Sequence, residues 1–160
     1  DDRIKEKYPN IVIAASQNTD YTRAGGMRVM ENLLQAHAEI DVIYTHEDEI
    51  ALGAIEALKA AGRMDPRIII TGNGGSGAAL ESIRNGEMTA CATYSPIDAG
   101  TIGMRAAAAI LRGEKVPKDI PLEGAIVTKE NVDRYYRAGM KNTDYVSTVD
   151  LAGTALTPPA

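Results

Sequence analysis

Phenylalanine and tryptophan are absent from this chain of 160 residues, so tyrosine supplies every aromatic side chain. The core must therefore be built from aliphatic residues, methionine and alanine. There is one cysteine, Cys91, which excludes an internal disulfide bond. Because Cys91 has small neighbours within an apolar run, we expect its thiol to be buried and unreactive.

Basic clusters and long apolar runs are also missing. The net charge of -5 and the scattered lysines and arginines are unsuited to a nucleic-acid surface. No run approaches the roughly 20 apolar residues that span a bilayer, and no signal peptide is present. Residues 1–7 have the pattern of a charged helix that begins upstream. We therefore expect a fragment of a longer protein, in which the missing signal peptide says little about compartment.

What is present is an alternation of apolar strands with amphipathic helices. Alternation of this kind predicts an α/β fold, a doubly wound parallel sheet in three layers with helices on both faces. Strands are predicted at 10–15, 41–44, 67–71 and 88–94, and helices at 21–35, 47–61 and 78–85.

The best-defined predicted unit is a buried strand at 42–44 followed by the helix at 47–61. The first turn of that helix is acidic, which suits the positive end of a helix dipole, and Gly62 is placed to end it. Open α/β sheets bind ligands beyond the carboxyl ends of their strands. The loops predicted at that edge span 16–21, 45–47, 72–76 and 94–98.

The pattern changes after Pro96. The helix predicted at 98–112 is apolar almost all round, so it needs cover on more than one side. A proline-containing loop, a strand at 125–128, a helix at 130–138 and a polar tail at 140–160 complete the chain.

Two motifs bear on cofactor and metal chemistry. Residues 72–77 match G-x-G-x-x-G between a strand and a helix, as in a dinucleotide site, but no acidic residue ends the next strand. The alternative is a tight glycine loop that lets a ligand approach the backbone. His46 precedes three acidic residues, but no other cluster supplies the remaining ligands of a metal site. We predict neither a cofactor nor a metal.

Four polar and aromatic residues are expected at the strand ends: Tyr21, Glu47, Asn73 and Tyr94. Aromatic faces together with a carboxylate and an amide are what a carbohydrate requires from its site. No evident nucleophile accompanies them. The set predicts binding of a polar small molecule without catalysis.

Residues 41–62 closely resemble periplasmic sugar-binding proteins of the ribose-binding type, which usually have Asn-Asp before Ala-Leu-Gly-Ala. The resemblance extends over residues 1–136, about the second half of a family protein. Further matches, in family order, are Ala-Ser-Gln at 15–17, Glu-Ser-Ile-Arg-Asn-Gly at 81–86, Ser-Pro at 95–96, Leu-Arg-Gly-Glu-Lys-Val-Pro at 111–117 and Val-Thr-Lys-Glu-Asn-Val at 127–132.

The resemblance implies roles for the four candidate residues. Tyr21 falls where the family stacks a ring on the sugar, and Tyr94 lies near a hinge position that often carries a glutamine. Glu47 stands where asparagine is usual and Asn73 where aspartate is usual. The amide and the carboxylate are thus exchanged between the two positions.

The resemblance also implies a two-lobed fold in which the ligand is gripped by hinge closure. Residues 1–95 would form the C-terminal lobe, 96–124 the hinge crossing and a helix of the N-terminal lobe, 125–139 the return, and 140–160 a tail. The N-terminal lobe would be missing from this chain or supplied by another chain.

The function so implied is the periplasmic or extracytoplasmic sugar-binding component of an ABC importer, which is not an enzyme. Its partners would be a monosaccharide or related polyol and a transporter permease. The alternative is the effector domain of a LacI-type transcriptional regulator, which shares the fold. A third hypothesis, a nucleotide-dependent enzyme, depends only on the glycine loop.

Overall fold

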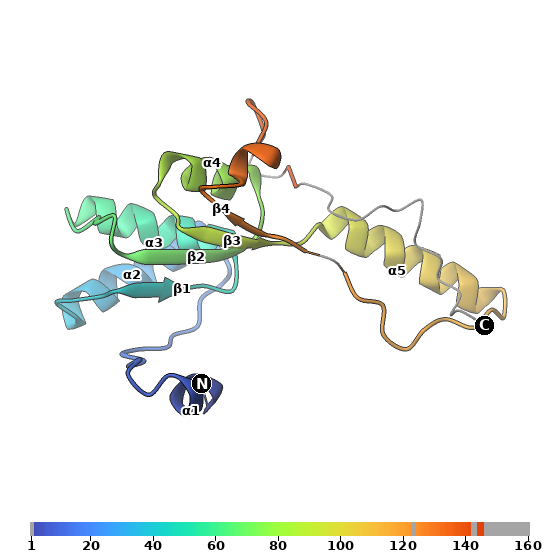
Figure 1. Cartoon of the computed structure of the whole chain (residues 1–160), viewed down its shortest axis with the longest axis horizontal. Helices are drawn as coiled ribbons and strands as arrows, with labels where there is room; N and C mark the ends of the chain where they lie inside the picture. Colours follow the sequence, from blue (N-terminus) through green and yellow to red (C-terminus); the bar gives the residue numbers. More distant parts are fainter. Residues whose placement is uncertain (1, 123, 142–143, 146–160) are drawn as a thin grey trace.

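The computed structural model describes residues 2–122, 124–141, 144 and 145 of the chain (Figure 1). Helices and strands alternate along most of it, as the sequence predicts. The elements are α1 (Asp2–Lys7), α2 (Arg23–Ala36), β1 (Val42–Tyr44), α3 (Asp48–Ala60), β2 (Ile69–Gly74), α4 (Gly77–Asn85), β3 (Ala90–Thr93), α5 (Pro96–Leu111), β4 (Ile126–Thr128) and the short 3-10 helix η1 (Val132–Arg134).

The strands form one mixed sheet in the order β1-β2-β3-β4. The first three are parallel, and β4 returns antiparallel to β3 with Val127 opposite Cys91. The strands predicted from 41–44 onward are all present, and the α/β class is confirmed. Gly62 and Gly86 follow α3 and α4 with positive φ angles of 64° and 79°, as glycines that end helices do.

The strand predicted at 10–15 is not formed, and this expectation was wrong. Ile11 and Val12 are 53% and 84% exposed. Residues 10–15 pair with no described strand, and β1 pairs directly with β2, with Ile43 opposite Ile70. A β-branched run becomes a strand only where a neighbouring strand takes its backbone hydrogen bonds.

Side chains alternate across the sheet between a buried face and an open one. Ile70, Cys91 and Val127 point to the buried face and are at most 1% exposed. Their neighbours on the other face are exposed: Val42 55%, Ile69 46% and Ile126 62%. The helical layer expected on that second face is therefore not complete within the described residues.

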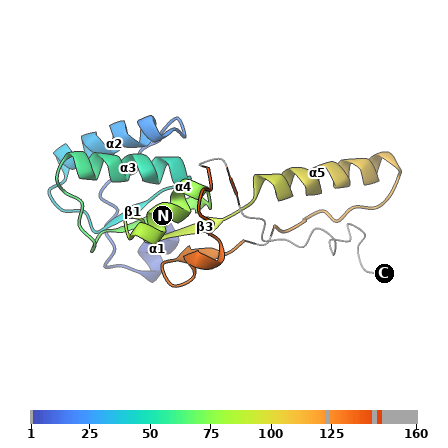
Figure 2. The same ribbon diagram turned by 90° about the horizontal axis from the view of Figure 1, so that it is seen from above.

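Helices α2 and α3 lie on the same side of the sheet (Figure 2). They approach closely through two glycines. A Cβ on Gly26 would lie 2.5 Å from the Ile50 carbonyl oxygen, and one on Gly53 would lie 2.0 Å from that of Arg23. Arg23 also forms an ion pair with Glu49 at 2.9 Å. As a result α3 is covered by the sheet on one side and by α2 on the other.

Helix α5 extends away from the sheet (Figure 1). Met104 is 72% exposed and Leu111 88%, so the described residues do not supply the cover that the sequence predicts for this apolar helix. The helix predicted at 130–138 is only the short η1. The Asn131 side chain folds back on the end of β4. It accepts a hydrogen bond from the Thr128 amide and donates one to the Ile126 carbonyl.

Candidate functional site

The candidate site lies at the carboxyl ends of the parallel strands, and Thr45 fixes its first loop. Its hydroxyl contacts the carbonyl oxygens of Glu47 at 2.8 Å and Thr71 at 2.9 Å. Thr45 is only 6% exposed. A buried side chain that joins the end of β1 to β2 in this way holds the start of α3 in a defined position.

Glu47 is the N-cap of α3, and its carboxylate accepts a hydrogen bond from the Glu49 amide. Burial raises the pKa of Glu47, an effect partly offset by that capping bond and reinforced by the negative charge of Asp48. One carboxylate oxygen is used in the cap. Glu47 is only partly buried, and a carboxylate can accept several hydrogen bonds, so it can also accept one from a ligand hydroxyl.

Asn73 and Tyr94 lie beside this loop. The Asn73 amide nitrogen is 3.4 Å from the carbonyl oxygen of His46, the residue before Glu47. The Tyr94 backbone amide donates to the Gly74 carbonyl at 3.0 Å, which places Tyr94 next to the end of β2. The structure thus brings Glu47, Asn73 and Tyr94 to one end of the sheet, and we name these three residues the polar edge.

Tyr21 stands apart from the polar edge. It immediately precedes the N-cap of α2, with a φ of 59° and a side chain that is 64% exposed. Within the described ranges, no hydrogen bond or ring contact joins it to the other three predicted residues. Its helix is held to α3 by the Arg23–Glu49 ion pair, two residues beyond Tyr21 and Glu47 respectively.

Asp48 is a site residue that the sequence interpretation missed. It is fully buried, and its Oδ2 accepts hydrogen bonds from the amides of Gly75 at 2.7 Å and Ser76 at 2.8 Å. Burial raises the pKa of Asp48 more than these two bonds lower it. An acidic residue in the first turn of a helix beside a glycine loop was the available signal.

The glycine loop at 72–77 contacts another part of the chain, whereas its G-x-G-x-x-G pattern is typical of a dinucleotide site. The Gly77 amide, at the start of α4, donates to the Asp144 carbonyl at 3.0 Å. A Cβ on Gly77 would lie 2.4 Å from the Lys141 carbonyl oxygen. Since the C-terminal segment occupies this helix start, the geometry argues against a pyrophosphate there.

Other chemistry finds little support in the described residues. None of their His, Cys, Asp and Glu side chains gather in threes or more as a metal site requires. Cys91 is 1% exposed, and burial together with the charge of Asp48 raises its pKa to about 12. In the part of the chain that the structure describes, no helix has the length and apolarity to cross a membrane.

Comparison with known proteins identifies relatives of both sequence and structure. A family model described as periplasmic binding protein domain matches residues 1–115. The ribose import binding protein of Bacillus subtilis (strain 168) is 39% identical over 108 residues, 68% of this chain and 34% of that protein. The ribose import binding protein of Salmonella typhimurium (strain LT2) is 34% identical over 118 residues, 74% of this chain and 39% of that protein.

A solved structure agrees with this assignment. The ABC transporter solute binding protein from Bacillus halodurans C-125 with bound myo-inositol superimposes with a TM-score of 0.76 at 32% identity. The match covers 83% of this chain and 46% of that one. The chain therefore spans less than half the length of these relatives, and it belongs to the periplasmic binding protein family.

Proposed function

We propose that this chain is the C-terminal lobe of an extracytoplasmic sugar receptor that delivers its ligand to an ABC importer. The observation that carries the proposal is the polar edge, where Glu47, Asn73 and Tyr94 lie at one end of the sheet and bring a carboxylate, an amide and an aromatic side chain to it. Planar polar groups beside a ring suit a ligand that has several hydroxyls and an apolar C–H face.

The relatives support a monosaccharide or related polyol as the ligand class. Two of them are named for ribose import, and a solved structure holds myo-inositol. They are import binding proteins, which favours a receptor over the effector domain of a LacI-type regulator. We propose no enzymatic activity, and family membership supports a periplasmic or extracytoplasmic location.

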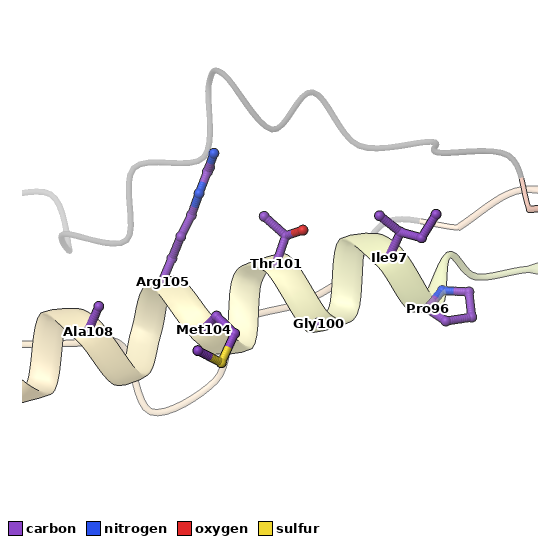
Figure 3. Close-up of a pocket in the computed structure, with 7 residues that line it drawn as sticks. All are labelled: Pro96, Ile97, Gly100, Thr101, Met104, Arg105 and Ala108. Carbon is purple, nitrogen blue, oxygen red and sulfur yellow. The ribbon is translucent and has the colours of Figure 1, made fainter.

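In this proposal a second lobe completes the site. Residues 1–95 and 125–139 belong to one lobe, while residues 96–124 cross to the other and contribute α5. A groove on α5 fits such a role, because it is lined by exposed apolar side chains such as Met104, and exposed apolar surface is typical of interfaces. Ile97, Thr101 and Arg105 extend from one side of the helix (Figure 3). The groove is lined by Pro96, Ile97, Gly100, Thr101, Met104, Arg105 and Ala108.

The test is calorimetry with D-ribose and myo-inositol on the protein that carries both lobes. Glu47→Ala leaves a ligand hydroxyl unpaired and should weaken binding by about 1.5–3 kcal/mol, the range for hydrogen bonds to charged groups. Glu81→Ala, which changes an exposed glutamate on α4, is the matched control. Equal affinity of the Glu47→Ala and wild-type proteins would remove Glu47 from the site, and no binding by the wild type to a wider sugar panel would overturn the function.

A further inference from the structure

Residues 140, 141, 144 and 145, which we call the docked segment, contact the start of α4 through their backbone. The Gly77 amide donates to the Asp144 carbonyl at 3.0 Å, and Tyr145 forms an antiparallel bridge with Ser76. Lys141 and Asp144 are also joined to each other, because the Lys141 amide donates to the Asp144 carboxylate at 2.7 Å. These contacts give the described part of the tail a defined position on the glycine loop.

The glycine loop is shaped to receive this segment. A side chain at Gly77 would meet the Lys141 carbonyl oxygen at 2.4 Å and the Met140 Cβ at 3.0 Å. At Gly74 an added Cβ would lie 3.6 Å from the ring carbon Cε1 of Tyr145, which is ordinary van der Waals contact. Gly74 and Gly77 thus both face the described residues of this segment.

The Tyr145 ring consequently lies at the polar edge. Gly74, which the ring approaches, follows Asn73 in the chain and accepts the backbone hydrogen bond of Tyr94. Burial raises the pKa of the Tyr145 phenol, and the negative charges of Glu47 and Asp48 raise it further. At neutral pH the phenol therefore keeps its proton and can donate a hydrogen bond.

We propose that Tyr145 is a further ligand-contacting residue, held against the glycine loop so that its ring and phenol extend the polar edge. The inference depends on the proposed function and adds to it a residue outside the family match at 1–115. The half-buried ring offers an apolar face to the C–H surface of a sugar. Its phenol supplies a donor beside carboxylates, which only accept.

The experiment measures D-ribose and myo-inositol affinity of the two-lobe protein by calorimetry for Tyr145→Ala and Tyr145→Phe. Loss of the ring should weaken binding by roughly tenfold or more, and loss of the hydroxyl alone by less. The ratio of the two affinities should also change, which a purely structural role would not produce. Tyr8→Ala is the control, since Tyr8 is a half-exposed tyrosine that follows α1.

A second variant tests the same inference without altering the ring. Gly77→Ala places a methyl group against the Lys141 carbonyl oxygen and should displace the segment. It should reproduce the effect of Tyr145→Ala on the affinity ratio, while thermal melting shows that the lobe remains folded. If Gly77→Ala unfolds the lobe, the two Tyr145 variants decide the matter alone.

The outcomes separate this inference from the proposed function. If the wild type binds sugar and Glu47→Ala weakens binding, but both Tyr145 variants bind like the wild type, only the role of Tyr145 is overturned. Tighter sugar binding by Tyr145→Ala would also overturn the proposed role of Tyr145, because the ring would then obstruct the ligand rather than contact it favourably. If the wild type binds no sugar, the proposed function fails and this inference fails with it.

Discussion

The Asp48 carboxylate oxygen Oδ2 accepts a hydrogen bond from the Ser76 amide at 2.8 Å, across 28 positions of sequence. The same oxygen accepts from the Gly75 amide at 2.7 Å. A single buried side chain at the start of α3 therefore satisfies two backbone donors of the glycine loop. Without it, the loop that carries Asn73 and pairs with Tyr145 would lose two of its hydrogen bonds.

Replacing Asp48 should lower the free energy of unfolding, and the loss should be larger when the replacement removes every hydrogen-bond acceptor of the side chain. Asp48→Ala leaves the Gly75 and Ser76 amides unpaired in the interior and should lower the free energy of unfolding by about 2–4 kcal/mol. Asp48→Asn keeps one carbonyl acceptor in place and should cost less. Urea unfolding followed by circular dichroism measures both, and equal losses for the two variants would contradict this role.

The raised pKa of Asp48 has a consequence for stability against pH. The folded state holds the Asp48 proton more tightly than the unfolded state, so the ionised form carries a penalty that is fully present above the raised pKa. As pH falls through that pKa toward 3.8, the wild type should gain stability relative to Asp48→Asn. The measurement is the difference between their unfolding free energies from pH 7 to pH 3.5. A difference that moves the other way would mean that the hydrogen bonds outweigh burial.

The close contact between α2 and α3 should not tolerate an added methyl group. At Gly53 a Cβ would lie 2.0 Å from the Arg23 carbonyl oxygen and 2.7 Å from the Met27 nitrogen. Gly53→Ala should therefore destabilise the chain by about 1–3 kcal/mol through overpacking. Gly103→Ala on α5 is the matched control, because none of the described residues lies within 4 Å of the added Cβ, and it should stabilise by roughly 0.5–1 kcal/mol. Equal thermal midpoints for the two variants would show that the helices separate easily.

Cys91 should be unreactive in the folded protein. Its thiol is buried, and with a pKa of about 12 almost none of it is thiolate at neutral pH. Ellman's reagent should label it only after unfolding in urea. Rapid labelling of the native protein at pH 7.5 would mean that β3 opens from the sheet far more often than a core strand does.

This chain alone should bind sugar poorly although it folds. One lobe leaves a face of the ligand in water and forgoes hydrogen bonds worth roughly 1 kcal/mol each. Addition of a separately made N-terminal lobe should restore calorimetric binding and also reduce the binding of an exposed-hydrophobe dye to α5. Micromolar affinity of the chain by itself would contradict the two-lobe account.

The features that the sequence predicted well are those set by local patterns. The helical spacing at 47–61 and the capping glycines Gly62 and Gly86 depend on residues within a turn or two of each other. The polar edge was also predictable, because parallel strands deliver their carboxyl ends to one side of a sheet. Glu47, Asn73 and Tyr94 follow from that rule alone.

The features that the sequence did not reveal depend on long-range partners. Residues 10–15 have the composition of a strand, but β1 pairs directly with β2. From the sequence, Asp48 is one of three acidic residues that suit the positive end of the α3 dipole. Its hydrogen bonds to the glycine loop join residues far apart in the sequence, so no local pattern indicates them. Tyr145 lies 71 positions beyond Gly74, too far for any local pattern to indicate their contact.

The backbone leaves the sheet for α5 and comes back at almost the same place. The Thr93 amide donates to the Ala125 carbonyl at 2.7 Å, and the Ala125 amide donates to the Thr93 hydroxyl at 2.8 Å. Both connections to α5 therefore start from neighbouring, hydrogen-bonded strands. A movement of α5 relative to the sheet therefore has to bend both connections together. This favours rotation of α5 about a single axis over a sliding of α5 along the sheet.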